Sequence, residues 1–355
     1  MSLNQIGILI AIIGYLFGMI YIGYRVSDRN KTVGDFYLGG RQLGPLVTAM
    51  SAEASDMSSW LLMGLPGVAY LSGIAEAGWT AIGLAVGTYL NWLIVAKRLR
   101  RYSEKLNAIT IPEFFTNRYH DKQNALKLMS ALVIIIFFVP YTASGFCACG
   151  KLFNSLFGIE YHVAMIISAI VIILYTTMGG FLAASTTDFI QSIIMSIALL
   201  IILGFGVSVA GGMDAVMDNA RNLTGYLSFT QSYDPSTQST VAYSGLAIAS
   251  TMAWGLGYFG MPHILLRFMA IEDDKKLSLS RRVASIWVVI SMAVSVLIGI
   301  VGLAVSKTGA IPVLEGNSSE TIIVQISHLL STRGFIFALI AGIVLSGILA
   351  STMST

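Results

Sequence analysis

Two acidic residues, Glu53 and Asp56, lie three positions apart in an apolar stretch rich in small and hydroxyl side chains. A carboxylate at the centre of a bilayer costs about 2.5–3.5 kcal/mol or more, so inside a membrane each acid needs a partner, a cavity or an ion. The helix breakers Gly64, Pro66 and Gly67 follow closely, which favours an interrupted helix. Unwound backbone exposes carbonyls to a cation and amides to a carboxylate. Alternatively, Asp56 only caps the second half-helix.

A second interrupted apolar stretch runs from Trp254 to His263 and again combines Trp, Gly and Pro. Its three glycines match G-x-G-x-x-G, but a dinucleotide site needs a preceding strand in a soluble βαβ unit, so we interpret the match as accidental. Two broken spans that cross in opposite directions are typical of inverted-repeat transporters. The rings of Trp254, Tyr258 and Trp60 would then enclose a small solute, or would simply pack or anchor the helices.

Hydroxyl and acidic side chains at two further places could assist a cation. Ser354 and Thr355 could offer oxygens to Na⁺, although such residues often bond only to a carbonyl of their own helix. Asp188 stands near the expected cytoplasmic start of a span, where it could serve an exit pathway or be an ordinary acid at a helix start. The four histidines form no ligand-spaced cluster, so no metal other than sodium is predicted.

The elements that carry these residues are membrane spans. The chain has 355 residues, of which 55% are hydrophobic and 11% charged, far from the roughly 25% charged residues of a soluble domain. Apolar runs of about 18 residues or more can cross a bilayer. The sequence predicts nine spans, at Ile6–Val26, Leu46–Leu71, Gly78–Ala96, Leu128–Cys149, Val163–Met178, Ile190–Val209, Val241–Leu265, Val283–Val305 and Phe335–Met353.

The positive charges predict the orientation of these spans. Lys and Arg accumulate in short cytoplasmic loops, and most of the 21 lie after the first, third and seventh spans. The four on the opposite side are Lys151, Arg221, Lys307 and Arg333. The N-terminus is therefore expected outside. In the loop after the third span, Thr110, Pro112 and Glu113 predict a short capped helix along the cytoplasmic interface.

Glycine spacing predicts where helices approach one another closely. Gly14 with Gly18, and Gly83 with Gly87, fit a pattern of small residues four apart. Such pairs allow backbones to pack tightly in membranes. We expect both pairs to pack within the bundle.

Along essentially its whole length the sequence resembles the sodium:solute symporter family, and within it the sodium/proline symporters. The resemblance implies a LeuT-type fold of two five-helix inverted repeats, with about thirteen helices and an extracellular N-terminus. Four helices would then be absent, in keeping with a last span that has no basic flank after it. The stretches that carry the resemblance are Leu38–Pro45, Ala54–Ser58, Trp60–Gly67, Tyr141–Gly145, Gly179–Ala183 and Trp254–Arg267.

The implied organisation has four parts. Residues 1–42 would form an extra first helix with its loop, 43–211 the first repeat, 212–240 an extracellular loop and 241–355 an incomplete second repeat.

The resemblance also implies roles for individual residues. Na⁺, the expected coupling ion, would bind carbonyls and hydroxyls of Ala54, Met57, Ser351, Ser354 and Thr355, assisted by Asp56 and Asp188, and no other cofactor is expected. The solute would lie near Ser58, Trp60, Tyr141, Trp254, Tyr258 and Pro262. Arg41 and Ser51 fall at further functionally sensitive positions.

The expected activity is sodium-coupled uptake of a small solute, with L-proline favoured, in the cell membrane. Glu53 and Ser59 depart from the proline-symporter pattern, which has glycine at both places. Ser59 leaves another amino acid or a carboxylate open as the solute, and Glu53 leaves proton coupling open. The alternative from another class is a symporter-like sensory membrane domain. An enzyme is disfavoured because no nucleophile–base pair, metal cluster or phosphate loop accompanies the spans.

Overall fold

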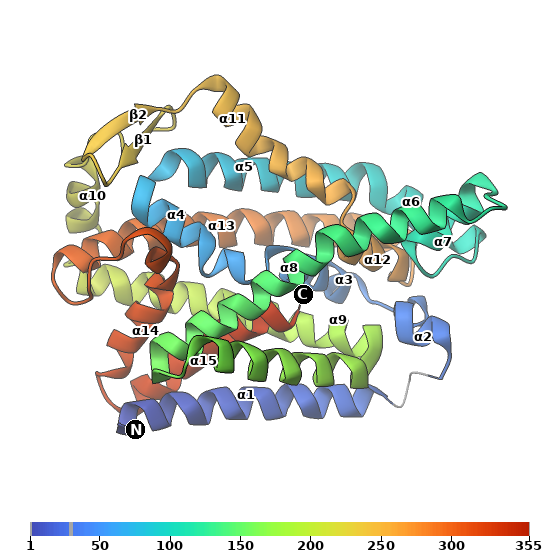
Figure 1. The fold of residues 1–355 in the computed structure, drawn as a ribbon, viewed down its shortest axis with the longest axis horizontal. Helices are drawn as coiled ribbons and strands as arrows, with labels where there is room; N and C mark the ends of the chain where they lie inside the picture. The colour runs from blue at the N-terminus through green and yellow to red at the C-terminus, as the bar shows by residue number, and fades with distance from the viewer. Residues whose placement is uncertain (1, 28–30, 355) are drawn as a thin grey trace.

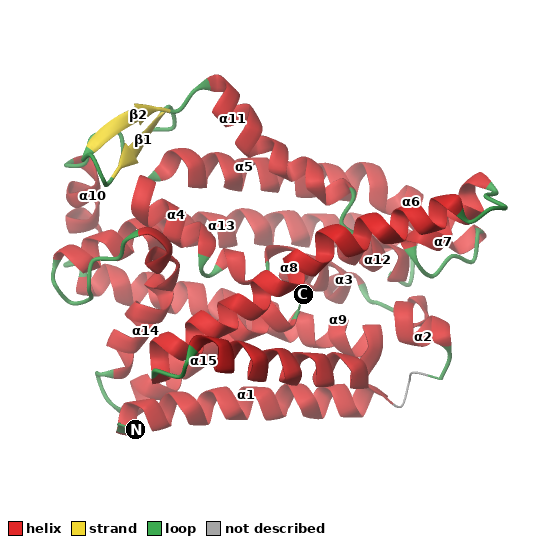
Figure 2. Cartoon of the chain, viewed as in Figure 1, coloured by secondary structure: helices red, strands yellow, loops and turns green. Residues whose placement is uncertain are grey.

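A computed structural model describes residues 2–27 and 31–354. They form a helical bundle with one small hairpin of strands, shown in yellow in Figure 2. The first half contains α1 (Leu3–Ser27), α2 (Val33–Leu38), η1 (Gly39–Arg41), α3 (Pro45–Met57), η2 (Ser59–Leu61), α4 (Gly64–Ser72), α5 (Ile74–Asn91), the π-helical η3 (Trp92–Ala96), α6 (Lys97–Lys105), α7 (Ile111–Tyr119) and α8 (Ala125–Phe157). The second contains α9 (Tyr161–Val209), α10 (Met213–Arg221), β1 (Gln231–Asp234), β2 (Ser239–Ala242), α11 (Gly245–Met252), η4 (Ala253–Phe259), α12 (Pro262–Ala270), η5 (Asp274–Lys276), α13 (Leu277–Lys307), η6 (Gly316–Thr321), α14 (Ile322–Ser331) and α15 (Phe335–Met353).

Six helices in the described part of the chain are long and apolar enough to cross a membrane. They correspond to the first, third, fourth, sixth, eighth and ninth predicted spans. The second and seventh predicted spans are missing from this count because each is broken into shorter helices. The fifth contributes a shorter apolar helix, Tyr161–Ile173.

The second predicted span breaks where the sequence indicates. Helix α3 ends at Met57, and Ser58 has φ 50° and ψ −165°. This backbone region is populated almost only by glycine and costs about 1–3 kcal/mol for another residue. The chain then passes through η2 and resumes as α4 at Gly64. The interruption therefore carries strain that the surrounding packing must hold.

The seventh predicted span is broken as well. It begins as α11, continues as the 3₁₀ segment η4 and resumes as α12, with Pro262 in its first turn. Proline is well placed at a helix start because its missing N–H has no partner there. The two breaks are adjacent in space, because the ring of Trp60 from the first and the ring of Trp254 from the second have centroids 4.8 Å apart.

A kink at Gly180 separates the fifth and sixth predicted spans. Its φ of 60° and ψ of −169° interrupt α9 in a conformation that only glycine adopts easily. The helix resumes before the predicted start at Ile190, so Asp188 lies inside a helix and not at its beginning. Helix α9 as a whole packs on α1, α3, α8, α13 and α15.

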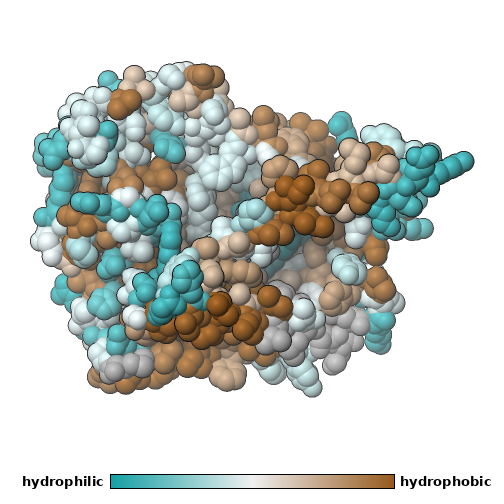
Figure 3. Space-filling view, viewed as in Figure 1, coloured by the Kyte–Doolittle hydropathy of each residue, from teal (hydrophilic) through white to brown (hydrophobic). Residues whose placement is uncertain are grey.

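The polar elements gather at the two ends of the bundle (Figure 1). The N-terminus, α10 and the hairpin lie at one end, and α2, α6 and α7 lie at the other. Figure 3 shows hydrophobic side chains between hydrophilic ends, the more prominent being the projection at the α7 end. The short helix predicted in the loop after the third span is confirmed as α7, whose cap Thr110 accepts a hydrogen bond from the amide of Glu113.

The two glycine pairs have different outcomes. A Cβ on Gly87 would stand 2.3 Å from the carbonyl oxygen of Gly255, and one on Gly83 would stand 2.6 Å from the Cα of Met252. Backbones of α5 and the seventh span therefore touch, as predicted. The prediction for Gly14 and Gly18 was wrong within residues 2–27 and 31–354, because nothing lies within 4 Å of either added Cβ.

Candidate functional site

Oxygen atoms from the second and ninth predicted spans meet at the end of α3. The hydroxyl oxygen of Ser354 lies 3.0 Å from the carbonyl oxygen of Ala54 and 3.0 Å from that of Ser351. Met57, also buried, is the last residue of α3. The structure thus brings together the helix ends that carry four of the five predicted sodium ligands. The fifth, Thr355, lies outside the described residues.

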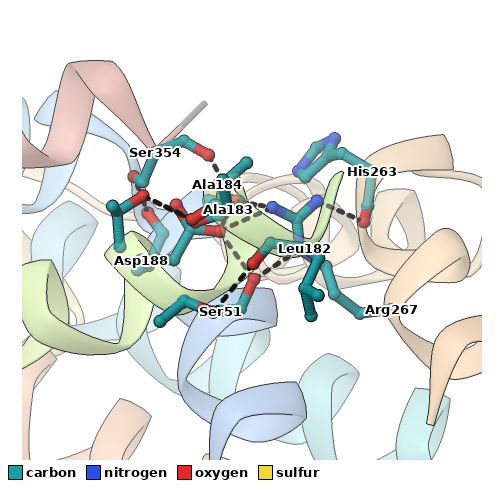
Figure 4. Close-up of polar contacts among 12 residues, drawn as sticks. Ser51, Leu182, Ala183, Ala184, Asp188, His263, Arg267 and Ser354 are labelled. Atoms are coloured by element: carbon teal, nitrogen blue, oxygen red, sulfur yellow. Dashed lines mark hydrogen bonds and ion pairs between the residues drawn. The ribbon is translucent and has the colours of Figure 1, made fainter. Parts of the chain in front are cut away.

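Asp188 stands next to this group and is 1% exposed. Its Oδ2 accepts a hydrogen bond of 2.6 Å from Ser51 and pairs with Nη2 of Arg267 at 2.8 Å. Figure 4 shows the Arg267 guanidinium reaching across to Ser51 and Asp188. Ser55 accepts a 2.6 Å bond from Arg267 and donates to the carbonyl of Ser354. A continuous polar network therefore joins the oxygen atoms around Ser354 to α9 and α12.

Asp56 is buried but differs from Asp188 in its partners. Neither carboxylate oxygen accepts a hydrogen bond of normal geometry within the part of the chain that the structure describes. The Tyr258 side chain is close enough to interact with it. The alternative in which Asp56 merely caps the following helix through backbone amides therefore has no support in the geometry. A buried carboxylate without such partners is costly unless a cation or a proton neutralises it.

A cavity of about 420 Å³ opens beside the two breaks. This volume falls in the range of roughly 300–1,000 Å³ that is typical of small-molecule sites. Its wall combines apolar rings and short polar groups. The predicted site residues that line it are Asp56, Met57, Ser58, Ser59, Trp60, Tyr141, Trp254 and Tyr258.

From Asp56 the cavity extends toward Lys151 and Glu320, which also line it and form an ion pair. These two residues lie on α8 and η6, toward the end of the bundle that carries the N-terminus. At the opposite end, Leu43 pairs with Ile271 as an isolated β-bridge that joins the chain before α3 to the chain after α12. The two segments are thereby tied together on the α2 side of the bundle.

Some predicted residues lie outside the cavity wall. Pro262 begins α12 but is not in contact with the cavity. Glu53 is 2% exposed and accepts a 3.0 Å hydrogen bond from the indole of Trp92. Ser51 belongs to the Asp188 network.

Arg41 also lies outside the cavity wall, at the α2 end of the bundle. It donates to the carbonyl oxygens of Met269 at 2.6 Å and Ala108 at 2.9 Å. Burial and the nearby charge of Arg100 lower the pKa of the Arg41 guanidinium. It clamps three segments and does not touch the proposed ligands.

Sequence reasoning missed two members of the network, Ser55 and Arg267. Arg267 is 5% exposed, but it lies two residues beyond the predicted span Val241–Leu265, where it counts among the positive charges of a cytoplasmic loop. Nothing in the sequence singles out Ser55, because it is one of several serines in a stretch rich in small and hydroxyl residues. Only the tertiary arrangement places its hydroxyl between Arg267 and Ser354.

Comparisons with known proteins agree with this geometry. Residues 36–355 match the family model described as the sodium:solute symporter family. The chain is 43% identical over 353 residues to a sodium/proline symporter of Escherichia coli, covering 96% of the chain and 65% of the relative. It is 44% identical over 350 residues to a sodium/proline symporter of Haemophilus influenzae, covering 96% of the chain and 66% of the relative.

A third relative is the high-affinity proline transporter PutP of Bacillus subtilis, 42% identical over 339 residues, with 95% of the chain and 68% of the relative covered. The chain thus spans about two thirds of the length of these relatives. Among solved structures, a substrate-bound, outward-open Na⁺-coupled sialic acid symporter matches with a TM-score of 0.78 at 20% identity, over 100% of this chain and 71% of that one. The family match and the identities agree with the broken spans and the buried polar network, and this chain belongs to the sodium:solute symporter family.

Proposed function

We propose that this chain forms the ion- and solute-binding part of a sodium-coupled symporter that takes up L-proline by alternating access. The observation that carries the proposal is the adjacency of two features: the oxygen group of Ala54, Ser351 and Ser354 and the cavity that begins at Asp56. A cation bound at the first would stabilise the backbone that shapes the second. Ion and solute are thereby coupled through α3.

Na⁺ would bind where α15 meets the break of the second span. Carbonyl oxygens of Ala54, Met57 and Ser351 and the hydroxyl of Ser354 offer the neutral, hard ligands that such a cation prefers. Thr355, the next residue, would complete the set. Asp56 and Asp188 would supply negative charge nearby without both acting as ligands, since Asp188 is already paired with Arg267.

Proline would bind in the cavity with its ring against the rings of Trp60 and Trp254, which contact each other. Backbone amides at the Ser58 interruption point to a place for its carboxylate. Ser59 adds a hydroxyl to the wall, so a related amino acid or a carboxylate is the solute to test next. Tyr141 stabilises the backbone next to the break, because its hydroxyl donates to the carbonyl of Ser55 at 3.0 Å.

In the proposed orientation, the N-terminus, α10 and the hairpin face the outside of the cell membrane, and the α2–α7 end faces the cytoplasm. This orientation rests on the bias of Lys and Arg toward the α2–α7 end. The cavity then faces outward, toward the Lys151–Glu320 pair. In the same proposal, the chain corresponds to nine helices of about thirteen in a LeuT-type inverted repeat.

The sodium gradient supplies enough energy for uptake. One Na⁺ that crosses 100 mV yields about 2.3 kcal/mol, and a tenfold gradient adds about 1.4 kcal/mol. Together they allow roughly several-hundredfold accumulation of a neutral solute. A one-to-one coupling is therefore sufficient.

The binding step tests this proposal most simply. We expect proline to change the tryptophan fluorescence of the purified protein in Na⁺ and not in K⁺, because Trp60 and Trp254 line the cavity. Ser354→Ala should raise the Na⁺ concentration at which half of the fluorescence change is reached, since the substitution removes a proposed sodium ligand. Equal responses in both salts would contradict the coupling of ion and solute.

A further inference from the structure

A shallow groove of about 360 Å³ lies on the outer surface of the α2–α7 end, apart from the solute cavity. Its floor is apolar and comes from three parts of the chain. Ile94 and Leu99 lie on η3 and α6, Phe114 and Phe115 on α7, and Phe259 on η4. Phe115 is 37% exposed and Ile94 41% exposed. This end of the bundle therefore offers an apolar slot that its own side chains leave open.

The rim of the groove is basic. Arg98, Tyr102 and Arg118 line it together with the apolar floor. The guanidinium carbon of Arg118 stands 4.3 Å from the centroid of the Tyr102 ring. This cation–π contact fixes the arginine of α7 beside α6. The guanidinium groups of Arg98 and Arg118 thus line the same apolar groove, and that of Arg118 is fixed by the Tyr102 ring.

Neighbouring charges leave the two rim arginines without acidic partners. Glu104 pairs with Arg100 at 2.8 Å, and Asp274 pairs with Arg101 at 2.6 Å. Within residues 2–27 and 31–354, neither rim arginine forms an ion pair with a carboxylate. The field at the rim is therefore positive, and an anion is the complementary ligand.

The groove lies at the level where the third predicted span leaves the bilayer. The apolar helix Ile74–Lys105 has 32 residues, whereas about 20 residues cross the hydrocarbon core. A span that starts at Ile74 thus leaves the core near Ile94. Arg98 then stands about one turn farther, at the level of the lipid headgroups.

We propose that this groove binds an anionic glycerophospholipid. The phosphate would lie between the guanidinium groups of Arg98 and Arg118, and one acyl chain would occupy the slot beside Ile94 and Phe115. Basic pockets next to membrane spans and amphipathic interfacial helices recognise lipids in this way. The proposal is independent of the transported solute. A lipid bound in this groove would anchor α7 to the membrane. Helix α7 also contacts α12, which contributes Leu265 to the groove.

Native mass spectrometry of the purified protein tests the proposal, with phosphatidylglycerol and phosphatidylcholine as the probes. The wild type should retain one phosphatidylglycerol in preference to phosphatidylcholine. The double variant Arg98→Gln/Arg118→Gln should weaken phosphatidylglycerol binding by about thirtyfold, as expected for two lost basic groups near a membrane surface. The matched control Lys122→Gln/Lys127→Gln removes the same charge from exposed positions of the same region and should bind as the wild type does.

A second variant probes the acyl chain. Ile94→Trp fills the slot but keeps both arginines, so it should also weaken retention. Excess inorganic phosphate should not displace the lipid, because free phosphate lacks the apolar part. Equal weakening in the lysine control, no preference for the anionic lipid, or full displacement by phosphate would each overturn the proposal. Thermal unfolding of every variant in detergent reports whether it is folded.

Discussion

At the scale of single residues, the network around Arg267 explains how a charge is tolerated deep in the bundle. The guanidinium makes hydrogen bonds to Ser51, Ser55 and the carbonyl of His263, and an ion pair with Asp188. A buried pair is not by itself strongly stabilising, but the loss of one partner leaves an uncompensated charge. Substitution of one partner should therefore lower the stability of the protein more than substitution of both partners together.

We predict that Arg267→Gln destabilises the protein by about 3–5 kcal/mol, because it leaves Asp188 buried and charged. Asp188→Asn alone should destabilise it by a similar amount. The double variant should recover most of the loss, since no charge is then left unpaired. Thermal unfolding of the purified variants in detergent measures the cycle, and simple additivity of the two losses would contradict the pairing.

At the scale of elements, the two broken spans are held together by close backbone packing. A Cβ on Gly255 would stand 2.1 Å from the carbonyl oxygen of Gly83, so the 3₁₀ segment η4 can approach α5 only because both residues are glycine. Without a hydrophobic effect between helices in lipid, such packing is a main source of association. This contact fixes the position of Trp254 and Tyr258 relative to the second span.

We predict that Gly255→Ala lowers stability by about 1–3 kcal/mol through overpacking, and that it weakens solute binding because η4 must shift. Gly257→Ala in the same segment is the matched control, because nothing lies within 4 Å of its added Cβ. Thermal unfolding and proline-dependent fluorescence compare the two variants. Equal behaviour of both would show that the approach of η4 to α5 does not matter.

The interruptions themselves could be predicted from the sequence, but the network could not. Gly64, Pro66 and the Trp254–His263 stretch carry local signals for broken helices, and the breaks occur at both places. The partners of Asp188 depend on contacts across 79 and 137 residues of sequence, which no local pattern contains. The resemblance assigns Pro262 to the solute, yet this residue stands in the first turn of α12 and does not line the cavity.

At the scale of the whole molecule, the polar ends and apolar middle in Figure 3 are those of a chain with the bilayer as its solvent. Hydropathy predicted the spans because every crossing segment must satisfy its own backbone hydrogen bonds. It misplaced the start of the sixth span because Gly180 turns the chain without a polar loop.

Orientation can be tested directly with single cysteines, after Cys147 and Cys149 are replaced by alanine. We predict that Ser236→Cys, in the turn of the hairpin, reacts with an impermeant maleimide added to intact cells. Lys122→Cys, at the opposite end, should react only after the cells are permeabilised. The reverse pattern would contradict the outward N-terminus.

The most direct test of sodium-coupled proline transport is uptake of labelled proline into proteoliposomes that contain the purified protein, with Na⁺ or K⁺ outside. The account predicts uptake in Na⁺ only, reduced to background by Asp56→Asn, which keeps the shape of the side chain but removes its charge from the cavity wall. Proline uptake that is equal in K⁺, or unchanged in Asp56→Asn, would contradict it.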